Sequence, residues 1–209
     1  MAEPKTRRPR GRPSQGVRDA IIRATLAVIA DSGLSNLTTK EIAERAGASE
    51  ASIYYHFADK TALVEGVIFE AVLKPLEELA AAFPAEATGK TLRDALLDYG
   101  ATLNAFWERV LPIVSAVQSD IELREEFAGR VAGLGYGPHR GVRVVSDYLA
   151  AEQEAGIVRA DLEPRGVALS FAGACFLSAY QRHMFGPAAR RKLPRLEDTI
   201  ETLVDLIEP

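Results

Sequence analysis

Apolar residues recur at spacings of three and four along most of this chain, which is the period of an α-helix that buries one face. The first such stretch covers 17–32, where Val17, Ile21, Ala24 and Val28 fall on one side. The same spacing covers 60–83, 91–110, 113–117, 123–131, 139–155, 164–184 and 196–207. The sequence contains neither strand and hairpin patterns nor internal repeats. We therefore predict an all-α protein.

A different pattern occupies 37–60, which reads LTTKEIAERAGASEASIYYHFADK. Thr38, with a glutamate three residues later, fits a capping box at the start of a short helix. Gly47 suits the left-handed residue that ends this helix, and Ser49 can cap a second helix over 50–56. Two short helices joined by a tight turn are typical of a helix-turn-helix, whose second helix enters the DNA major groove.

The second helix of this motif carries two adjacent tyrosines, Tyr54 and Tyr55. Its inward positions are small or apolar, at Ala51, Ile53 and Phe57. Adjacent residues lie about 100° apart on a helix, so both tyrosines cannot fully face one core. The simpler alternative is that both pack against the first helix. We expect one to be partly buried and the other to lie at the DNA backbone, where its hydroxyl can donate to a phosphate.

The run TTKEIAERAGASEASIYYHFADKTALV resembles the DNA-binding region of the TetR family of bacterial transcriptional regulators. The resemblance covers residues 17 to about 70 and is strongest at the tract YYHF followed by Lys60 and Leu63. Residues 1–16 are rich in Pro, Gly and Arg, which predicts a disordered basic arm. The resemblance implies a homodimer in which a three-helix DNA-binding head (17–58) follows this arm. A ligand-binding and dimerisation body of about six helices follows over 59–209.

The same resemblance implies a set of DNA contacts on the helix-turn-helix and at the start of the next helix. These positions are Thr38, Thr39, Lys40, Ser49, Glu50, Ala51, Ser52, Tyr54, Tyr55, His56 and Lys60. Glu50 is an unusual member of the set. Its carboxylate can accept a hydrogen bond from a cytosine amino group, or it can simply favour the N-terminus of its helix.

Positive charge is concentrated near the start of the chain, although the whole chain carries a net charge of −4. Residues 1–60 hold 10 Lys and Arg against 7 Asp and Glu, whereas the remaining residues hold 15 against 22. The segment PRGRP, with Arg10 and Arg12, resembles the core of an AT-hook, because glycine and flanking arginines suit a narrow minor groove. A solvated basic tail explains the same composition equally well.

The body offers candidate residues for an effector site and for a dimer interface. Aromatic and apolar residues that could line a cavity, or could equally be core, are Tyr99, Leu103, Trp107, Phe127, Phe171, Phe176 and Tyr180. Small residues in 164–184 and a seam at spacings of four and three in the last helix suggest dimer packing, with ordinary packing within one chain as the alternative. The candidate interface residues are Phe171, Cys175, Leu196, Ile200, Leu203 and Ile207.

Prolines and glycines predict where the body helices end. We expect a kink or break at Pro75, a helix end at Pro112, and a flexible connection over the glycine cluster 129–137.

Other chemistries find little support in the sequence. Its three histidines have no partner at metal-ligand spacing, so we expect no metal and no cofactor. No helix-length apolar run reaches the roughly 18 residues of a membrane span, which favours a cytoplasmic protein. No nucleophile has an activating base nearby, so an enzyme that uses this fold is the least favoured reading.

The sequence therefore predicts a ligand-responsive DNA-binding regulator, most simply a repressor. It would leave a pseudo-palindromic operator when a small apolar or amphipathic effector binds the body. The alternative is an effector-independent DNA-binding or partner-recruiting protein of the same fold.

Overall fold

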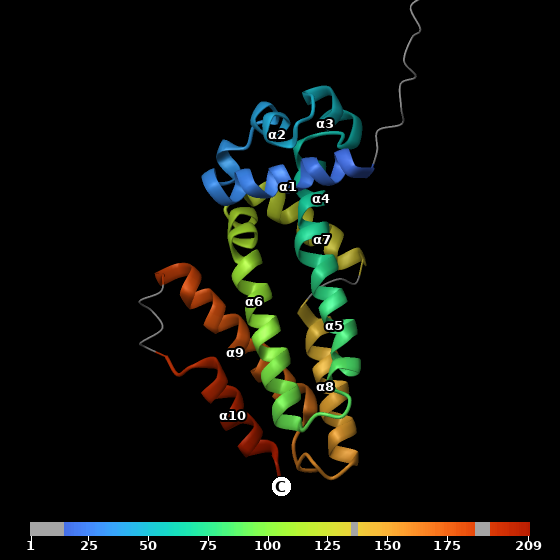
Figure 1. Cartoon of the computed structure of the whole chain (residues 1–209), viewed down its shortest axis with the longest axis vertical. Helices are drawn as coiled ribbons and strands as arrows, with labels where there is room; N and C mark the ends of the chain where they lie inside the picture. The colour runs from blue at the N-terminus through green and yellow to red at the C-terminus, as the bar shows by residue number, and fades with distance from the viewer. Residues whose placement is uncertain (1–14, 135–137, 187–192) are drawn as a thin grey trace, which may run out of the picture. The chain divides into compact units, whose positions relative to one another are not determined.

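The computed structural model describes residues 15–134, 138–186 and 193–209. Within these ranges the chain is helical and contains no strand, which confirms the all-α prediction. The helices form two compact units, one ending at Val67 and the other beginning at Ile68 (Figure 1). Each unit is described separately below. The predicted arm, with Arg10 and Arg12, lies outside the described residues.

The first unit contains α1 (Gln15–Ser32), a short 3₁₀ turn η1 (Leu34–Asn36), α2 (Thr39–Ala46), α3 (Glu50–His56) and most of α4 (Lys60–Ile68). Each helix contributes apolar side chains to one small core. Its most deeply buried members are Ile21, Val28, Ile42, Ile53, Leu63, Val64 and Val67. The only buried polar residue among those described is Thr25, whose hydroxyl donates to the Ile21 carbonyl at 2.8 Å.

The boundary between the two units falls near the end of α4, whereas the sequence suggested a boundary before its first residue. The reason is the packing of α4 against the residue that follows α3. A Cβ on Gly66 would lie 2.8 Å from Cε1 of Phe57, so glycine is what allows this close approach. Asp59 caps α4 as expected, because its Oδ1 accepts from the amide of Ala62 at 2.7 Å.

In its described residues, the second unit continues from α4 with a π-helical turn η2 (Phe69–Leu73) and then six α-helices. These are α5 (Lys74–Ala87), α6 (Leu92–Gln118), α7 (Ile121–Leu134), α8 (Pro138–Glu154), α9 (Pro164–Phe185) and α10 (Leu196–Ile207). Helix α6 packs against α9 and α10, and α8 packs against α5 and α9. Gly100 of α6 makes room for its neighbour, because a Cβ there would collide with Cδ1 of Ile200 in α10.

The core of this second unit is aromatic at its centre. The rings of Phe83 and Tyr99 lie 4.2 Å apart between centroids, and Tyr99 stacks on Phe171 at 6.1 Å. Cys175 is fully buried on α9, and burial raises the pKa of its thiol to about 12. The thiol is therefore neutral at physiological pH and packs as a small apolar group.

Two of the expected helix ends are wrong, and the helix is continuous at a third position. Helix α6 continues through Pro112 to Gln118, because Ile113 and Val117 beyond the proline are buried in the core. Helix α7 continues through the glycines at 129 and 133, so these do not belong to a connection. At Pro75 the helix does not break: it runs continuously from α4 into α5, and its hydrogen-bond pattern changes in the π-helical turn η2 just before the proline.

Replacing Gly47 by alanine should destabilise the first unit by about 1–2 kcal/mol, because this glycine ends α2 in the left-handed region at φ 62°. No atom lies within 4 Å of the position a Cβ would take, so backbone strain is the whole cost. Gly141→Ala is the matched control, since this helical glycine also has open space and should gain about 0.5–1 kcal/mol. Thermal and urea unfolding of both variants would measure these opposite signs, and equal effects would contradict the explanation.

Candidate nucleic-acid interface and body pocket

The helix-turn-helix begins and ends at the caps that the sequence predicts. Oγ1 of Thr38 accepts from the amide of Glu41 at 3.3 Å, and Oγ of Ser49 accepts from the amide of Ser52 at 3.2 Å. The expected return contact of the capping box is replaced by an ion pair, because the Glu41 carboxylate accepts from Arg45 at 2.8 Å. The two short helices therefore begin at fixed residues, and the tight turn between them starts at Gly47.

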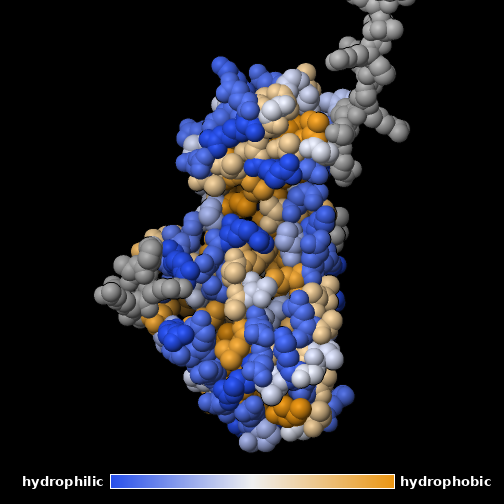
Figure 2. Space-filling view, in the orientation of Figure 1, coloured by the Kyte–Doolittle hydropathy of each residue, from blue (hydrophilic) through white to orange (hydrophobic). Residues whose placement is uncertain are grey.

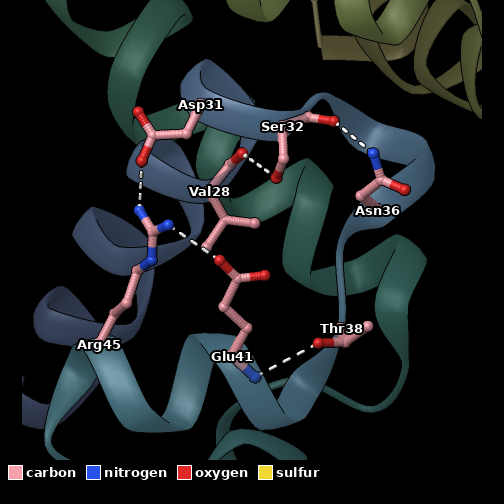
Figure 3. A network of polar contacts seen from close by, with 7 residues as sticks. All are labelled: Val28, Asp31, Ser32, Asn36, Thr38, Glu41 and Arg45. Atoms are coloured by element: carbon pink, nitrogen blue, oxygen red, sulfur yellow. Dashed lines mark hydrogen bonds and ion pairs between the residues drawn. The ribbon is translucent and has the colours of Figure 1, made fainter.

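Arg45 of α2 forms an ion pair with Asp31 near the end of α1, a contact that the sequence alone did not reveal. Its guanidinium donates to Asp31 at 2.6 Å and to Glu41 at 2.8 Å (Figure 3). Near this pair, the Asn36 amide donates to the carbonyl of Ser32 at 2.8 Å. Exposed ion pairs add little to stability, so the consequence is mainly the orientation of α2 on α1. The partners are 14 residues apart, a spacing that no local sequence rule picks out.

Both tyrosines of α3 face solvent, which corrects the expectation that one of them would be partly buried. Tyr54 is 57% exposed and Tyr55 is 68% exposed. A helix of two turns has room for one inward stripe, which Ile53 and then Phe57 occupy. Ala51, expected to face inward, is exposed as well. The outer surface of α3 therefore presents two phenolic hydroxyls that can meet a phosphate.

A row of hydroxyls and one carboxylate joins the N-termini of α2 and α3. The Thr39 hydroxyl donates to Oε2 of Glu50 at 2.5 Å, across the turn between the helices. The hydroxyls of Ser49 and Ser52 lie 2.9 Å apart. The first contact orients the Glu50 carboxylate, and Glu50 is exposed at the start of the helix that would enter the major groove. An acid fixed there is suited to accept from a cytosine amino group.

The side chains of His56 and Lys60 are less free to contact a DNA phosphate than the sequence suggested. Nε2 of His56 is shielded from solvent and has no hydrogen-bond partner among the described residues. That nitrogen does not meet a phosphate in this conformation. The Lys60 ammonium lies 3.4 Å from the carbonyl oxygen of Leu34 and remains exposed, as does Lys40. Both lysine side chains are therefore exposed on the head, whereas Nε2 of the histidine is shielded.

Replacing Tyr55 by phenylalanine should weaken operator binding about 2- to 10-fold without changing thermal stability, because only one exposed hydroxyl is lost. Fluorescence anisotropy with labelled operator would measure the change. Tyr148→Phe in the body is the matched control, and DNA affinity should not respond to it. Equal affinity of wild-type protein and the Tyr55 variant would remove this hydroxyl from the interface.

The residues proposed from sequence for an effector site fall into two groups. Tyr99, Leu103 and Phe171 are buried in the packed core of the second unit. Trp107, Phe176 and Tyr180 form an aromatic row, with ring centroids 5.1 Å and 5.8 Å apart, and the last two are exposed. The side chain of Phe127 is outside the described part of the structure. The sequence pattern cannot separate these roles, because core and cavity aromatics share the same helical spacing.

The structure instead has a pocket of about 700 Å³ between α6, α9 and α10. Its walls come from Ala101 and Asn104 of α6, from 174–182 of α9, and from 193–199 at the start of α10. None of the described effector candidates lines it. Its lining is mixed, with small apolar side chains beside amides, hydroxyls and arginines, and a search restricted to large aromatics could not find it.

The residues proposed for dimerisation are mostly buried within one chain. Phe171, Cys175, Ile200 and Ile207 have almost no exposed surface, because they pack α9 and α10 onto α6. The alternative of ordinary packing within one chain therefore applies to these four. Leu196 and Leu203 keep part of their surface and remain candidates.

A different stripe on α9 is exposed, and we call it the α9 stripe. It consists of Leu169, Gly173, Phe176, Tyr180 and Met184, at spacings of four, three, four and four. Gly173 has no atom within 4 Å of the position a Cβ would take, so another helix backbone can approach closely there. On α10, Leu206 is exposed as well.

The described residues contain neither a metal-binding cluster nor a membrane-spanning helix. No group of three or more His, Cys, Asp or Glu side chains is placed to hold a metal ion. No helix in the described ranges is both long and apolar enough to cross a bilayer.

These features define an all-α chain with a helix-turn-helix head and a helical body. Residues 21–67 match the family model described as bacterial regulatory proteins, tetR family. Residues 21–67 of this chain therefore form a DNA-binding head of the tetR family.

Curated relatives match mainly this head. The class C tetracycline repressor protein of Escherichia coli is 41% identical over 50 residues, which cover 24% of this chain and 23% of the repressor. The HTH-type transcriptional regulator BetI of Stenotrophomonas maltophilia is 34% identical over 88 residues, covering 40% of this chain and 44% of BetI. These alignments thus span less than half the length of each relative.

Solved structures extend the likeness to the whole fold. Salmonella enterica GusR superposes with a TM-score of 0.66 at 19% identity, covering 92% of this chain and 95% of GusR. The transcriptional regulator FadR of Bacillus subtilis, solved in complex with stearoyl-CoA, gives 0.59 at 18% identity, covering 90% of this chain and 96% of FadR. At these identities the likeness concerns the fold alone.

Proposed function

We propose that this protein is a homodimeric transcriptional repressor that leaves its operator when a small amphipathic effector binds the body. The observation that carries the DNA-binding part is the outer surface of α3. There, exposed Tyr54 and Tyr55 stand beside a carboxylate that Thr39 holds at the helix N-terminus. Base-edge and phosphate contacts can thus come from one short helix, as recognition by a helix-turn-helix requires.

Dimerisation is part of the proposal because one α3 offers too few contacts for a specific site. The exposed α9 stripe supplies an apolar surface with the spacing of helix–helix packing. Two copies of the head would then read two half-sites roughly 34–36 Å apart, one turn of the DNA helix, and the operator would be a pseudo-palindrome.

Two features support control by an effector: the body has a pocket, and the helices that line it also carry the proposed dimer contacts. Helices α9 and α10 line the pocket, and they also carry the exposed apolar residues proposed for dimer contact. A ligand that binds one arrangement of these helices better than another shifts the population between them, and operator affinity changes by the same differential affinity. A protein of this fold binds an acyl-CoA, which supports an amphipathic ligand.

Selection of DNA fragments from a random pool by the purified protein tests the DNA-binding part. An inverted repeat with half-sites one helical turn apart should emerge. The protein with both Tyr54 and Tyr55 replaced by alanine is the control and should select nothing specific. Enrichment of a single non-repeated site, or of no sequence, would contradict the proposal.

The alternative is a DNA-binding protein of the same fold that recruits a partner and takes no effector. The exposed Leu177, Met184 and Phe185 of α9 could serve such a partner. The pocket of about 700 Å³ favours the repressor, because its volume lies within the range of small-molecule sites. Screening small molecules for release of the selected operator separates the two, since no compound should act on the alternative protein.

A further inference from the structure

The side chain of Glu50 places an acid on the surface that is proposed to meet DNA. Glu50 is exposed as the first residue of α3, and residues at the start of a recognition helix reach base edges. In the space-filling view, the end of the head that carries α2 and α3 shows hydrophilic residues beside weakly polar ones (Figure 2). Phosphates repel a carboxylate, so Glu50 lowers the affinity for DNA in general. Any gain from it must lie in the choice of sequence.

One oxygen of this carboxylate is held by the preceding helix. The Thr39 hydroxyl donates to Oε2 of Glu50 at 2.5 Å, the short distance of a hydrogen bond to a charged acceptor. Thr39 is half-buried as the first residue of α2, and its β-branched side chain has few rotamers. Because Thr38 and Ser49 cap the two helices, the bond joins two defined helix starts. The carboxylate thus has a defined position on the motif.

The other oxygen of the carboxylate is available to DNA. Oε1 of Glu50 has no hydrogen-bond donor among the described residues, and a carboxylate oxygen can only accept. Thr39 has one hydroxyl hydrogen, which it donates to Glu50, so it cannot donate to a phosphate in this arrangement. Both residues were expected to contact DNA, but the hydroxyl of Thr39 is engaged within the protein.

The four bases present different groups to a carboxylate in the major groove. Cytosine offers its N4 amino group, a donor with no acceptor beside it on the same base. Adenine offers the N6 amino group, but its N7 acceptor lies next to that donor. Guanine presents N7 and O6, and thymine presents O4, which are all acceptors and repel a carboxylate. A carboxylate in a fixed position therefore selects cytosine.

We infer that Glu50 reads one cytosine in each half-site of the operator, and that Thr39 is the positioning residue that orients its carboxylate. This inference rests on the proposed function, for which it names one base of the DNA partner. When α3 enters the groove, water leaves and the bond between hydroxyl and carboxylate becomes stronger. A mobile carboxylate would swing away from a wrong base, whereas one held by Thr39 stays against it. Specificity then comes from rejection of wrong bases as well as from the new hydrogen bond.

Selection from a random DNA pool by full-length wild-type protein and by the Glu50→Gln variant tests the assigned base. The wild-type protein should yield an inverted repeat with cytosine at one position of each half-site. The variant should yield the same repeat with adenine at that position, because a glutamine amide pairs with N7 and N6 of adenine. The same cytosine in both selections would overturn the inference and leave the proposed function standing. The absence of any repeat with wild-type protein would refute both.

Titrations with four DNA duplexes that differ only at this base pair measure the discrimination. Wild-type protein should bind the cytosine duplex about 5- to 100-fold more tightly than the other three, and Glu50→Ala should bind all four alike. Glu50→Ala should also bind unrelated DNA more tightly, since a negative charge is removed. Glu44→Gln is the matched control, because it removes an exposed acid from α2 and should keep the cytosine preference. If Glu50→Ala keeps this preference and only loses thermal stability, Glu50 merely favours the start of its helix, and the inference fails.

Three further proteins test the positioning role of Thr39. Thr39→Val keeps the shape of the side chain without its hydroxyl and should reduce the cytosine discrimination about 3- to 10-fold. Thr39→Ser restores a hydroxyl and should recover most of that loss. In the Glu50→Ala protein, Thr39→Val should change the discrimination no further, because its partner is absent. An equal loss in both backgrounds, or no recovery with serine, would refute the positioning role.

Discussion

Replacing Leu169 by glutamate should convert the proposed dimer into monomers and weaken operator binding by about 10²–10⁴-fold. Leu169 is 62% exposed at the start of the α9 stripe, so a charge there leaves the core of one chain intact. Between two copies, the same charge would be buried without a partner, which is strongly unfavourable. The second half-site would then bind as a separate molecule, and the avidity of a linked pair would be lost.

The chain offers a closely matched control for this substitution. Ile121 at the start of α7 is also 62% exposed, but it lies outside α9 and α10. Ile121→Glu should remain a dimer with full operator affinity. Sizing by light scattering and operator titration of the two variants side by side measures both effects. A dimeric Leu169 variant would move the interface away from the α9 stripe and back toward Leu196 and Leu203.

The local structure of the head could be predicted because its signals lie within a few residues. Thr38, Gly47, Ser49 and Asp59 each act on a backbone group at most four residues away, and all four have the roles that their types suggest. The resemblance to a family of transcriptional regulators then indicates that this helix-turn-helix binds DNA.

The sequence did not reveal contacts that depend on how the helices are placed. The link from Arg45 to Asp31 and the hydroxyl bond from Thr39 to Glu50 join different helices. The shielding of His56 likewise depends on its neighbours in space.

In the body, helical spacing predicts which residues are buried better than it predicts whether they pack against the same chain or a second one. Ile200 and Ile207 were correctly recognised as one apolar face of the last helix. That face is filled by the same chain, where Ile200 lies directly against Gly100. A seam at spacings of four and three packs equally well within one chain or between two. The exposed α9 stripe has the same spacing, and only the structure shows which seam is already occupied.

The continuation of α6 through Pro112 has a physical cause. A proline inside a helix costs about 3 kcal/mol in isolation, and helical glycines cost about 0.5–1 kcal/mol each. Burying one large aliphatic side chain contributes about 1.5–3 kcal/mol. Beyond Pro112 both Ile113 and Val117 are buried, so burial outweighs the local penalty and α6 continues. Local rules are reliable where no core residue follows the breaker.

Deleting residues 1–13 should weaken DNA binding and reduce its dependence on salt. The deleted segment lies outside the described residues, so the prediction rests on its composition, with five cations against one acid. If Arg10 and Arg12 of each arm meet phosphates or the minor groove, four charges are lost per dimer. Each contributes a slope of roughly −0.9 in log K against log salt, so the slope should change by about 3–4 units.

If the arm inserts into the minor groove, binding should also depend on the sequence of the flanking DNA, which a solvated tail does not predict. A·T-rich DNA beside each half-site should bind better than G·C-rich DNA, because its groove is narrower and more negative, and only while the arm is present.

Replacing both Arg10 and Arg12 by glutamine, with Lys5, Arg7 and Arg8 retained, separates the motif from bulk charge. If the arm enters the groove, this variant should lose the flank preference as completely as the deletion does. A solvated tail would change the slope by less than about one unit and ignore the flanks. Titrations of the three proteins on both flanks across a salt series therefore decide between insertion and a tail.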